Sequence, residues 1–194
     1  MYALEKRYIT DGSNDRVINQ MDFDMDNSPE SLQSAFDFAY SEAARLGFPA
    51  YLKAIEESQP ANSAPYVTRL SELPEVFQDT ERLRLLNALE VLIARLNDLG
   101  NRVHSLLIGG SFLDLRRTPK DLDALVLCES GTSLKPASEL VKEARASGLD
   151  LRLFPIDGNP TVVVKMVSFF TILYTSDRLD LKRRNGIVLV DCAA

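Results

Sequence analysis

Two short groups of residues in the second half of the chain have the types and spacing needed for phosphate chemistry. Gly109, Gly110 and Ser111 directly follow an apolar run, and Asp121 and Asp123 open a second one. Glycine lets a ligand approach the backbone closely, and free N–H groups beside a serine hydroxyl can hold a phosphate. Aspartates two residues apart on a strand project from one face, where a cation relieves their mutual repulsion. Oxygen ligands favour Mg²⁺ or Mn²⁺, which usually bind substrate phosphates as well.

A glycine–serine turn beside a pair of aspartates is the minimum equipment for handling a nucleoside triphosphate. The loop between the two groups also carries Arg116, Arg117 and Lys120, which could neutralise phosphate charge. A solvated basic loop with no ligand is an equally good interpretation of these three residues. The residues therefore predict a candidate nucleotide site, with its basic contacts left open.

The arrangement resembles the nucleotidyltransferase superfamily of the DNA polymerase β type, in its minimal bacterial form. The family pattern is a strand ending in Gly-Ser, a loop, Asp-x-Asp entering a second strand, and a later carboxylate on a third strand. Gly110 and Ser111 match the first element, and Asp121 and Asp123 match the second. The resemblance implies a mixed sheet flanked by helices.

The third carboxylate of the family pattern has two candidates. Asp150 stands at the start of the next expected strand, and Asp157 stands at its far end. The resemblance extends over about residues 74–191, whereas residues 1–65 match no pattern of the family. We therefore expect a partly helical N-terminal extension at 1–65 and a nucleotidyltransferase-like domain at 66–194.

The reaction implied by the resemblance is attack of an acceptor hydroxyl on the α-phosphate of a nucleoside triphosphate, with loss of pyrophosphate. The acceptor would be a protein or an RNA, as in toxin–antitoxin members of the superfamily. Asp121, Asp123 and Asp150 would be the catalytic residues and would hold Mg²⁺ or Mn²⁺, the third also helping to deprotonate the acceptor. The nucleotide would be bound by four residues: Gly109, Gly110, Ser111 and Lys120.

Two other functions remain open at this point. A degenerate member would keep the fold without catalysis and act as a binding or regulatory protein, engaging a protein partner through its acidic N-terminal region. An enzyme that modifies a small molecule, such as an antibiotic adenylyltransferase, would need a deep acceptor pocket. The sequence does not choose among these.

The elements that must position the site can be predicted from hydrophobic spacing. Five leucines at helical spacing predict a helix between Asp79 and Gly100 that faces the core: Leu85, Leu89, Leu92, Leu96 and Leu99. Further helices are expected at 29–46, 49–57, 133–147 and 159–174, and strands at 2–10, 103–108, 121–127, 149–156 and 186–191. This order predicts an α/β or α+β fold. The proline-containing segment 58–65 is expected to be a linker.

Composition and charge exclude several other classes of protein. The chain has 194 residues, 45% of them hydrophobic, which is enough for a core and excludes a mainly disordered state. Its net charge of −6 argues against a protein that coats nucleic acid, although the charge divides into −8 for residues 1–100 and +2 for 101–194. The only histidine, His104, excludes a histidine-rich zinc centre.

Localisation is expected to be cytoplasmic. The two cysteines lie far apart in the sequence, and the first ten residues contain no apolar stretch typical of a secretory signal. The longest apolar run, 162–174, contains a lysine and is too short to span a bilayer. We expect that run to form a buried helix.

Overall fold

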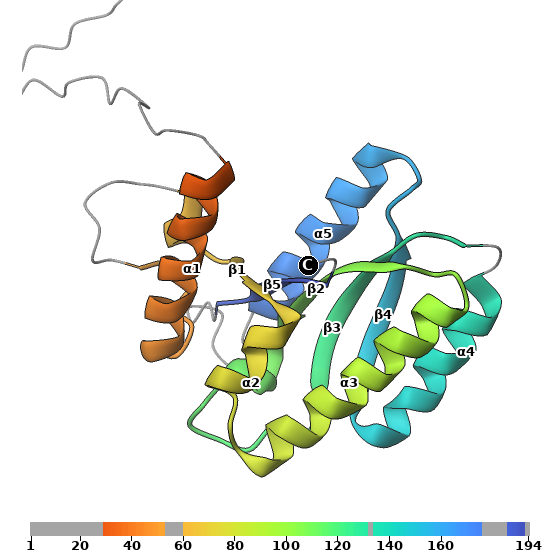
Figure 1. Ribbon diagram of the computed structural model, residues 1–194, viewed down its shortest axis with the longest axis horizontal. Coiled ribbons are helices and arrows are strands. Elements are labelled where there is room, and N and C mark those ends of the chain that lie inside the picture. Colours follow the sequence, from red (N-terminus) through yellow and green to blue (C-terminus); the bar gives the residue numbers. More distant parts are fainter. Residues whose placement is uncertain (1–28, 53–59, 132–133, 176–185, 193–194) are drawn as a thin grey trace, which may run out of the picture.

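The fold is α+β, a mixed five-stranded sheet with helices packed on it, as the sequence predicts. The computed structural model describes residues 29–52, 60–131, 134–175 and 186–192, and all statements below concern these residues (Figure 1). The helices are α1 (Pro29–Arg45), α2 (Leu73–Val76), α3 (Thr80–Asp98), α4 (Leu134–Ala144) and α5 (Pro160–Thr175). The strands are β1 (Tyr66–Arg69), β2 (Val103–Gly109), β3 (Leu122–Cys128), β4 (Leu149–Pro155) and β5 (Val188–Asp191).

The sheet has the strand order β1-β5-β2-β3-β4. β2 is antiparallel to both of its neighbours, β5 and β3, whereas the pairs β1–β5 and β3–β4 are parallel. The Gly-Gly motif therefore lies at the end of β2, at the same edge of the sheet where β3 and β4 begin. This edge is where the motifs predicted from the sequence meet.

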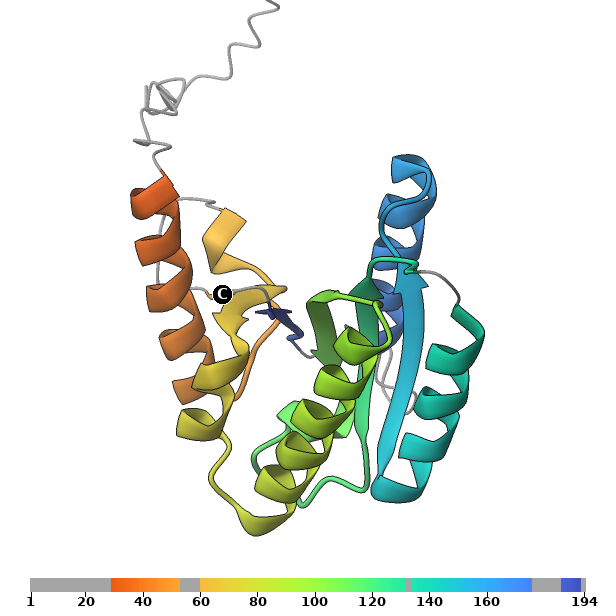
Figure 2. The same cartoon turned by 45° about the vertical axis from the view of Figure 1, so that its right-hand side comes forward.

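The two faces of the sheet are covered by different helices. α3 and α4 pack on one face and α5 packs on the other (Figures 1 and 2). Side chains alternate between the faces along each strand. In β2, for example, Leu106 and Ile108 belong to the core under α3, whereas Leu107 belongs to a smaller cluster with Phe170 of α5.

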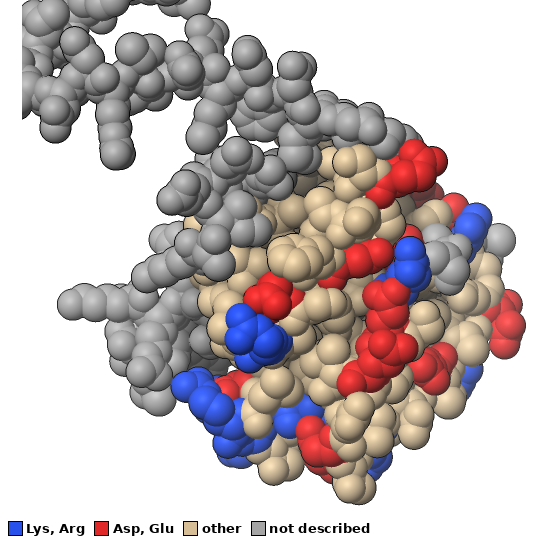
Figure 3. All heavy atoms as spheres, turned by 60° about the vertical axis from the view of Figure 1, so that its left-hand side comes forward, with Lys and Arg blue, Asp and Glu red and all other residues tan. Residues whose placement is uncertain are grey.

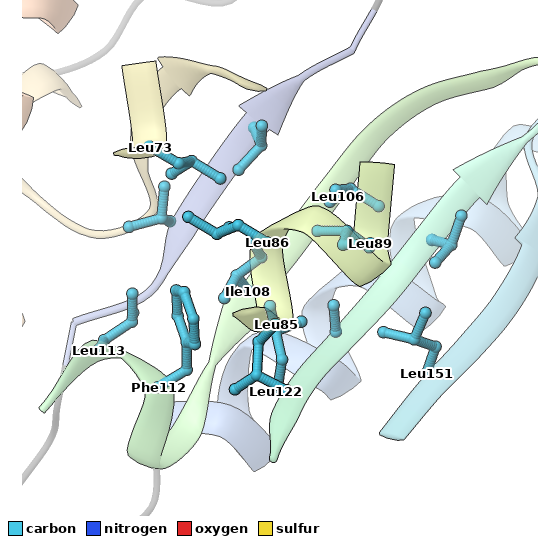
Figure 4. Packing of buried hydrophobic residues seen from close by; sticks show 14 of the residues in the cluster. Leu73, Leu85, Leu86, Leu89, Leu106, Ile108, Phe112, Leu113, Leu122 and Leu151 are labelled. Atoms are coloured by element: carbon cyan, nitrogen blue, oxygen red, sulfur yellow. The ribbon is translucent and has the colours of Figure 1, made fainter. Parts of the chain in front are cut away.

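The leucine stripe of α3 supplies much of the main core. Leu85, Leu89, Leu92 and Leu96 are buried in the main core, as predicted. Figure 4 shows Leu85 and Leu89 among the residues of this core. Leu99 differs from the prediction and is 40% exposed. The helix ends at this residue, which is its C-cap, so the side chain leaves the stripe.

The N-terminal part of the described chain shares this core. Ala39, Tyr40 and Ala43 of α1 are buried in the same hydrophobic cluster as Tyr66 of β1. The expected division near residue 65 therefore does not coincide with a break in the core. The predicted strand at 2–10 lies outside the described residues.

The expected linker at 58–65 is wrong for the part that can be described. Residues Pro60–Asn62 form a 3₁₀ turn, and both Ala61 and Asn62 are buried. Tyr51 pairs with Ser63 in an isolated β-bridge, so the described start of the predicted helix 49–57 is not helical either. Turn-forming residues predicted a loop here, but tertiary contacts pack the segment against α1.

α5 departs from the expectation of a buried helix. Phe170 is buried, but Val164, Phe169 and Ile172 are each more than half exposed. One side of the helix contacts the sheet, and the described chain leaves the opposite side uncovered. No helix in the described part of the chain is both long and apolar enough to cross a membrane.

The face that carries α1 is rich in acidic side chains. Figure 3 views the molecule from this side and shows Asp and Glu gathered in a band, with Lys and Arg at its lower edge. α1 itself carries Glu30, Asp37 and Glu42 against the single base Arg45, which pairs with Glu42. Part of the negative charge of the first half of the chain therefore lies on one surface of the molecule.

Candidate functional site

The register of three neighbouring strands brings the two sequence motifs together. Gly109 of β2 lies opposite Asp123 of β3, and Asp123 lies opposite Asp150 of β4. Directly paired residues on adjacent strands project to the same face, here the α5 face. Asp121 has the same parity as Asp123 and precedes β3 by one residue.

A cleft of about 490 Å³ opens at this row of residues. Its lining residues come from the Gly-Gly turn, the start of β3, β4 and α5: Gly110, Asp121, Asp123, Asp150, Arg152, Phe170, Leu173 and Tyr174. Three carboxylates and a guanidinium therefore line a cleft whose apolar and aromatic wall comes from α5. Such a mixture of an apolar wall with a few convergent polar groups is typical of a ligand site.

Close packing explains why the cleft has two successive glycines at the end of β2. Gly110 has a φ of +69°, and a Cβ at this position would lie 2.5 Å from Oδ2 of Asp123. A Cβ on Gly109 would lie 2.5 Å from Cβ of Tyr174. Any larger residue would push either the carboxylate or α5 out of place.

Gly110→Ala tests this packing. We expect a loss of about 1–3 kcal/mol from the positive φ, and a further loss because the new methyl group displaces the Asp123 carboxylate. Gly100→Ala is the matched control, since Gly100 has a φ of +80° with no atom within 4 Å of its would-be Cβ. Urea unfolding of both variants measures the difference. Equal destabilisation would mean that contact with Asp123 contributes nothing.

Asp150 is already engaged by basic residues. Nη1 of Arg152 donates a hydrogen bond of 2.6 Å to Oδ1 of Asp150, and Nη2 of Arg145 lies 3.4 Å from the same oxygen. Arg152 was not singled out from the sequence. The signal available there was its position two residues after Asp150, which places both side chains on one face of a strand.

The pKa of Tyr174 is raised by burial and by the negative charges of the cleft. Burial raises the pKa of its phenol well above the ordinary value, and the charges of Asp123 and Asp150 raise this pKa further, while Arg152 opposes them. The tyrosine is therefore a neutral hydrogen-bonding group at any physiological pH. It lies on the apolar α5 wall, directly beside the carboxylates.

The carboxylates of the cleft are oxygen donors of the kind that a divalent cation binds, but they do not form a complete ligand group. Asp121 and Asp123 bring carboxylate oxygens to the cleft, and hard oxygen donors are what Mg²⁺ and Mn²⁺ prefer. Within the described residues, no three His, Cys, Asp or Glu side chains form a ready-made ligand group. Asp150 is the donor that would have to exchange its arginine partners to complete one.

Asp157, the alternative third carboxylate, does not belong to the cleft. It follows the far end of β4, roughly 20 Å from Asp150 at about 3.3 Å per residue. Its carboxylate accepts hydrogen bonds from the amide and the hydroxyl of Ser130, at 3.2 and 2.6 Å. These bonds, the hydroxyl's first, hold the pKa of Asp157 below its ordinary value. Of the two candidates, only Asp150 is placed beside Asp123 by the strand register.

Not all residues expected at the phosphate site line the cleft. Of the four residues expected to bind the nucleotide, Gly110 lines the cleft, whereas Gly109, Ser111 and Lys120 do not. Arg116 and Arg117 both pair with Asp114, at 2.8 and 3.2 Å. After Gly109 the chain enters a 3₁₀ turn (Gly110–Leu113), and the two arginines of the loop that follows bind the carboxylate of Asp114 rather than the cleft.

The side chain of Arg82 binds backbone carbonyls of the Gly110–Leu113 turn and of the loop that follows it. This role was not predicted from the sequence. Its side chain is only 3% exposed, and its guanidinium donates to the carbonyls of Phe112, Asp114 and Arg117 at 2.7, 2.6 and 2.9 Å. It also pairs with Asp79, the N-cap of α3. The sequence carried a signal, because Arg82 precedes Leu85 by three residues and so continues the buried stripe of the helix.

Neither the two cysteines nor the histidine lines the cleft. Burial raises the pKa of Cys128 to about 11 and that of Cys192 to about 12, so both thiols stay protonated near neutral pH. His104 lies near the start of β2, opposite the end that carries Gly109, and its Nε2 is 3.0 Å from Oε1 of Glu129. The ionisable groups that line the cleft are therefore three carboxylates, one guanidinium and one phenol.

The cleft lies in the part of the chain that matches a known protein family. Residues 50–191 match a family described as a family of unknown function (DUF6932). The chain belongs to this family. No curated protein and no solved structure matches the chain significantly. Every residue that lines the cleft lies within the DUF6932 region, as does Arg82. Because the family description carries no activity, the geometry of the cleft has to support any functional proposal.

Proposed function

We propose that the protein is a nucleotidyltransferase that moves a nucleoside monophosphate from a nucleoside triphosphate to a hydroxyl of a protein or RNA acceptor, with Mg²⁺ or Mn²⁺. The observation that carries the proposal is the row formed by Gly109, Asp123 and Asp150 across three adjacent strands. It supports the resemblance drawn from the sequence, because that pattern requires the glycine turn and the carboxylates to meet at one edge of the sheet.

Each group of residues in the cleft would have a separate role in nucleotide transfer. Asp121 and Asp123 would hold the cation, which neutralises phosphate charge and stabilises the charge that develops during transfer. The turn at Gly110 would let the triphosphate approach the backbone, and Arg152 would contact a phosphate through its guanidinium. The apolar wall of α5 would limit the access of water.

Chemically, the acceptor oxygen forms a bond to the α-phosphorus while the bond from that phosphorus to the bridging oxygen of the β-phosphate breaks. The products are the nucleotidylated acceptor and pyrophosphate. Asp150, once free of its arginine partners, is positioned at the cleft to take the proton of the acceptor hydroxyl. No side chain of the cleft needs to form a covalent intermediate.

Transfer of a labelled nucleotide tests this proposal. The full chain is incubated with cell extract, Mg²⁺ or Mn²⁺, and each of four nucleoside triphosphates labelled at the α-phosphate. We expect a labelled acceptor whose sensitivity to protease or to ribonuclease identifies its class. Absence of label with every nucleotide and both cations would contradict the proposal.

A catalytically silent binding protein is the second candidate, and one observation favours it. Asp150 is paired with two arginines, and the described residues hold no preformed group of three metal-binding side chains. Such a protein would engage its partner through the acidic face that carries α1. It predicts a complex that co-purifies equally well with the wild-type chain and with the double variant Asp121→Asn, Asp123→Asn.

A further inference from the structure

We infer that Arg152 keeps Asp150 closed to cations until a phosphate draws the guanidinium away, so that phosphate and cation bind the cleft cooperatively. The inference rests on the proposed function and adds a mode of regulation to the same site. Its starting point is that Arg152 and Arg145 contact the same atom of Asp150, Oδ1, at 2.6 and 3.4 Å. Two positive charges at this carboxylate oppose the approach of a cation and compete with it for the negative charge.

The ion pairs of Asp150 with Arg152 and Arg145 are exposed enough to exchange partners. The side chains of Asp150, Arg152 and Arg145 are 39, 47 and 56% exposed, and ion pairs with this access to water are weak. Separating a buried ion pair would cost much free energy, whereas separating an exposed pair of this kind costs little. Arginine also binds phosphate oxygens with two parallel hydrogen bonds, so a phosphate is a strong competitor for the guanidinium.

The surroundings of Arg152 leave room for the movement. Arg152 lines the cleft with Asp123, and it also lines a shallower hollow that it shares with Asp121, Arg145 and Asp150. The guanidinium can therefore turn from Asp150 toward a phosphate in the cleft without disturbing the core. Movement of one charged group would at once free a cation ligand and supply a phosphate ligand.

Reciprocal linkage follows from this arrangement. If phosphate binding releases Asp150, then cation binding at Asp150 must release Arg152 for phosphate by the same free energy. Removing either partner of the pair should uncouple the two ligands, with opposite effects on each. A residue that merely supports the fold would weaken both ligands together, whereas loss of any nearby positive charge gives opposite signs, so the size of the effect has to be compared with that of a charge that does not contact Asp150.

The experiment measures two ligands separately on the full chain. Mn²⁺ alone is titrated by the loss of its free electron paramagnetic resonance signal, and inorganic triphosphate alone is titrated by calorimetry, which avoids any choice of base. For Arg152→Gln we expect Mn²⁺ to bind about two- to fivefold more tightly and triphosphate about fivefold more weakly. For Asp150→Asn we expect the reverse signs.

Arg84→Gln is the matched control for loss of one positive charge nearby. Arg84 donates to Glu81 and to the carbonyl of Ser147, next to the hollow, so its partners do not include Asp150. We expect its Mn²⁺ affinity to stay within about 1.5-fold of the wild type, the effect of one distant, screened charge. If Arg152→Gln changes Mn²⁺ affinity no more than Arg84→Gln does, the inference is overturned.

Asp123→Asn separates failure of the inference from failure of the proposed function. Loss of Mn²⁺ binding in Asp123→Asn together with equal behaviour of Arg152→Gln and Arg84→Gln would overturn the regulatory inference alone. If the wild-type chain binds neither Mn²⁺ nor triphosphate, the proposed function and the inference both fall. Opposite changes for the two ligands in Arg152→Gln support both.

Discussion

Asp123→Asn is expected to reduce nucleotidyl transfer by at least about a hundredfold, because it removes one negative charge from the centre of the row of residues that we propose to hold the cation. Asp123 is paired in register with both Gly109 and Asp150, so it lies between the turn and the third carboxylate. Asparagine keeps the shape of the side chain, and the sheet should therefore remain intact. Initial rates of label transfer, with circular dichroism as the check on folding, measure the effect.

Asp157→Asn is the control for this prediction. Asp157 was the competing candidate for the third carboxylate, but it is bound to Ser130 beyond the opposite end of β4. We expect transfer by this variant to stay within about twofold of the wild type, as for an ordinary surface substitution. A comparable loss in both variants would indicate a general effect of removing acidic charge and would contradict the assignment.

The sequence predicted the elements that carry strong periodicity and the two motifs at their ends. The helix of the leucine stripe and the strands that hold Gly109, Asp123 and Asp150 all occur within one or two residues of the expected bounds. These segments are long and apolar, so the hydrophobic pattern alone determines them. The α+β class followed from their order.

Short elements with distant partners could not be predicted. β1 and α2 have four residues each, too few for a periodic signal. β1 is stabilised by pairing with β5, more than a hundred residues later in the chain. α5 was misjudged for a related reason: apolar residues on all sides predicted full burial, but burial depends on how many neighbours the fold provides.

The candidate site shows the same division between local pattern and tertiary register. Glycine and aspartate motifs are visible in the sequence because each lies on one segment. The choice of Asp150 over Asp157 needed the pairing of β3 with β4. Leu173 and Tyr174 reach the cleft from a helix that carries no polar motif, so nothing in their local sequence linked them to the carboxylates.

Arg82→Met is expected to lower the free energy of unfolding by about 3 kcal/mol, because it leaves three buried or half-buried carbonyls without their donor. Methionine retains much of the apolar stem, so the loss reports mainly the hydrogen bonds to Phe112, Asp114 and Arg117. The guanidinium also lies over the ring of Phe112, with Cζ 5.9 Å from the ring centroid. Equilibrium unfolding in urea measures the change.

Arg84→Met provides the comparison within the same helix. Arg84 lies two residues from Arg82 but is exposed, and we expect its replacement to change stability by no more than about 0.5 kcal/mol. Arg82→Lys should fall between the two, since an ammonium keeps the charge but cannot donate to three carbonyls in the fixed geometry of a guanidinium. Equal stabilities for Arg82→Met and Arg84→Met would contradict this role for Arg82. Because Phe112, whose carbonyl Arg82 holds, directly follows Ser111, a large loss for Arg82→Met alone would tie the shape of the candidate phosphate turn to one buried charge in α3.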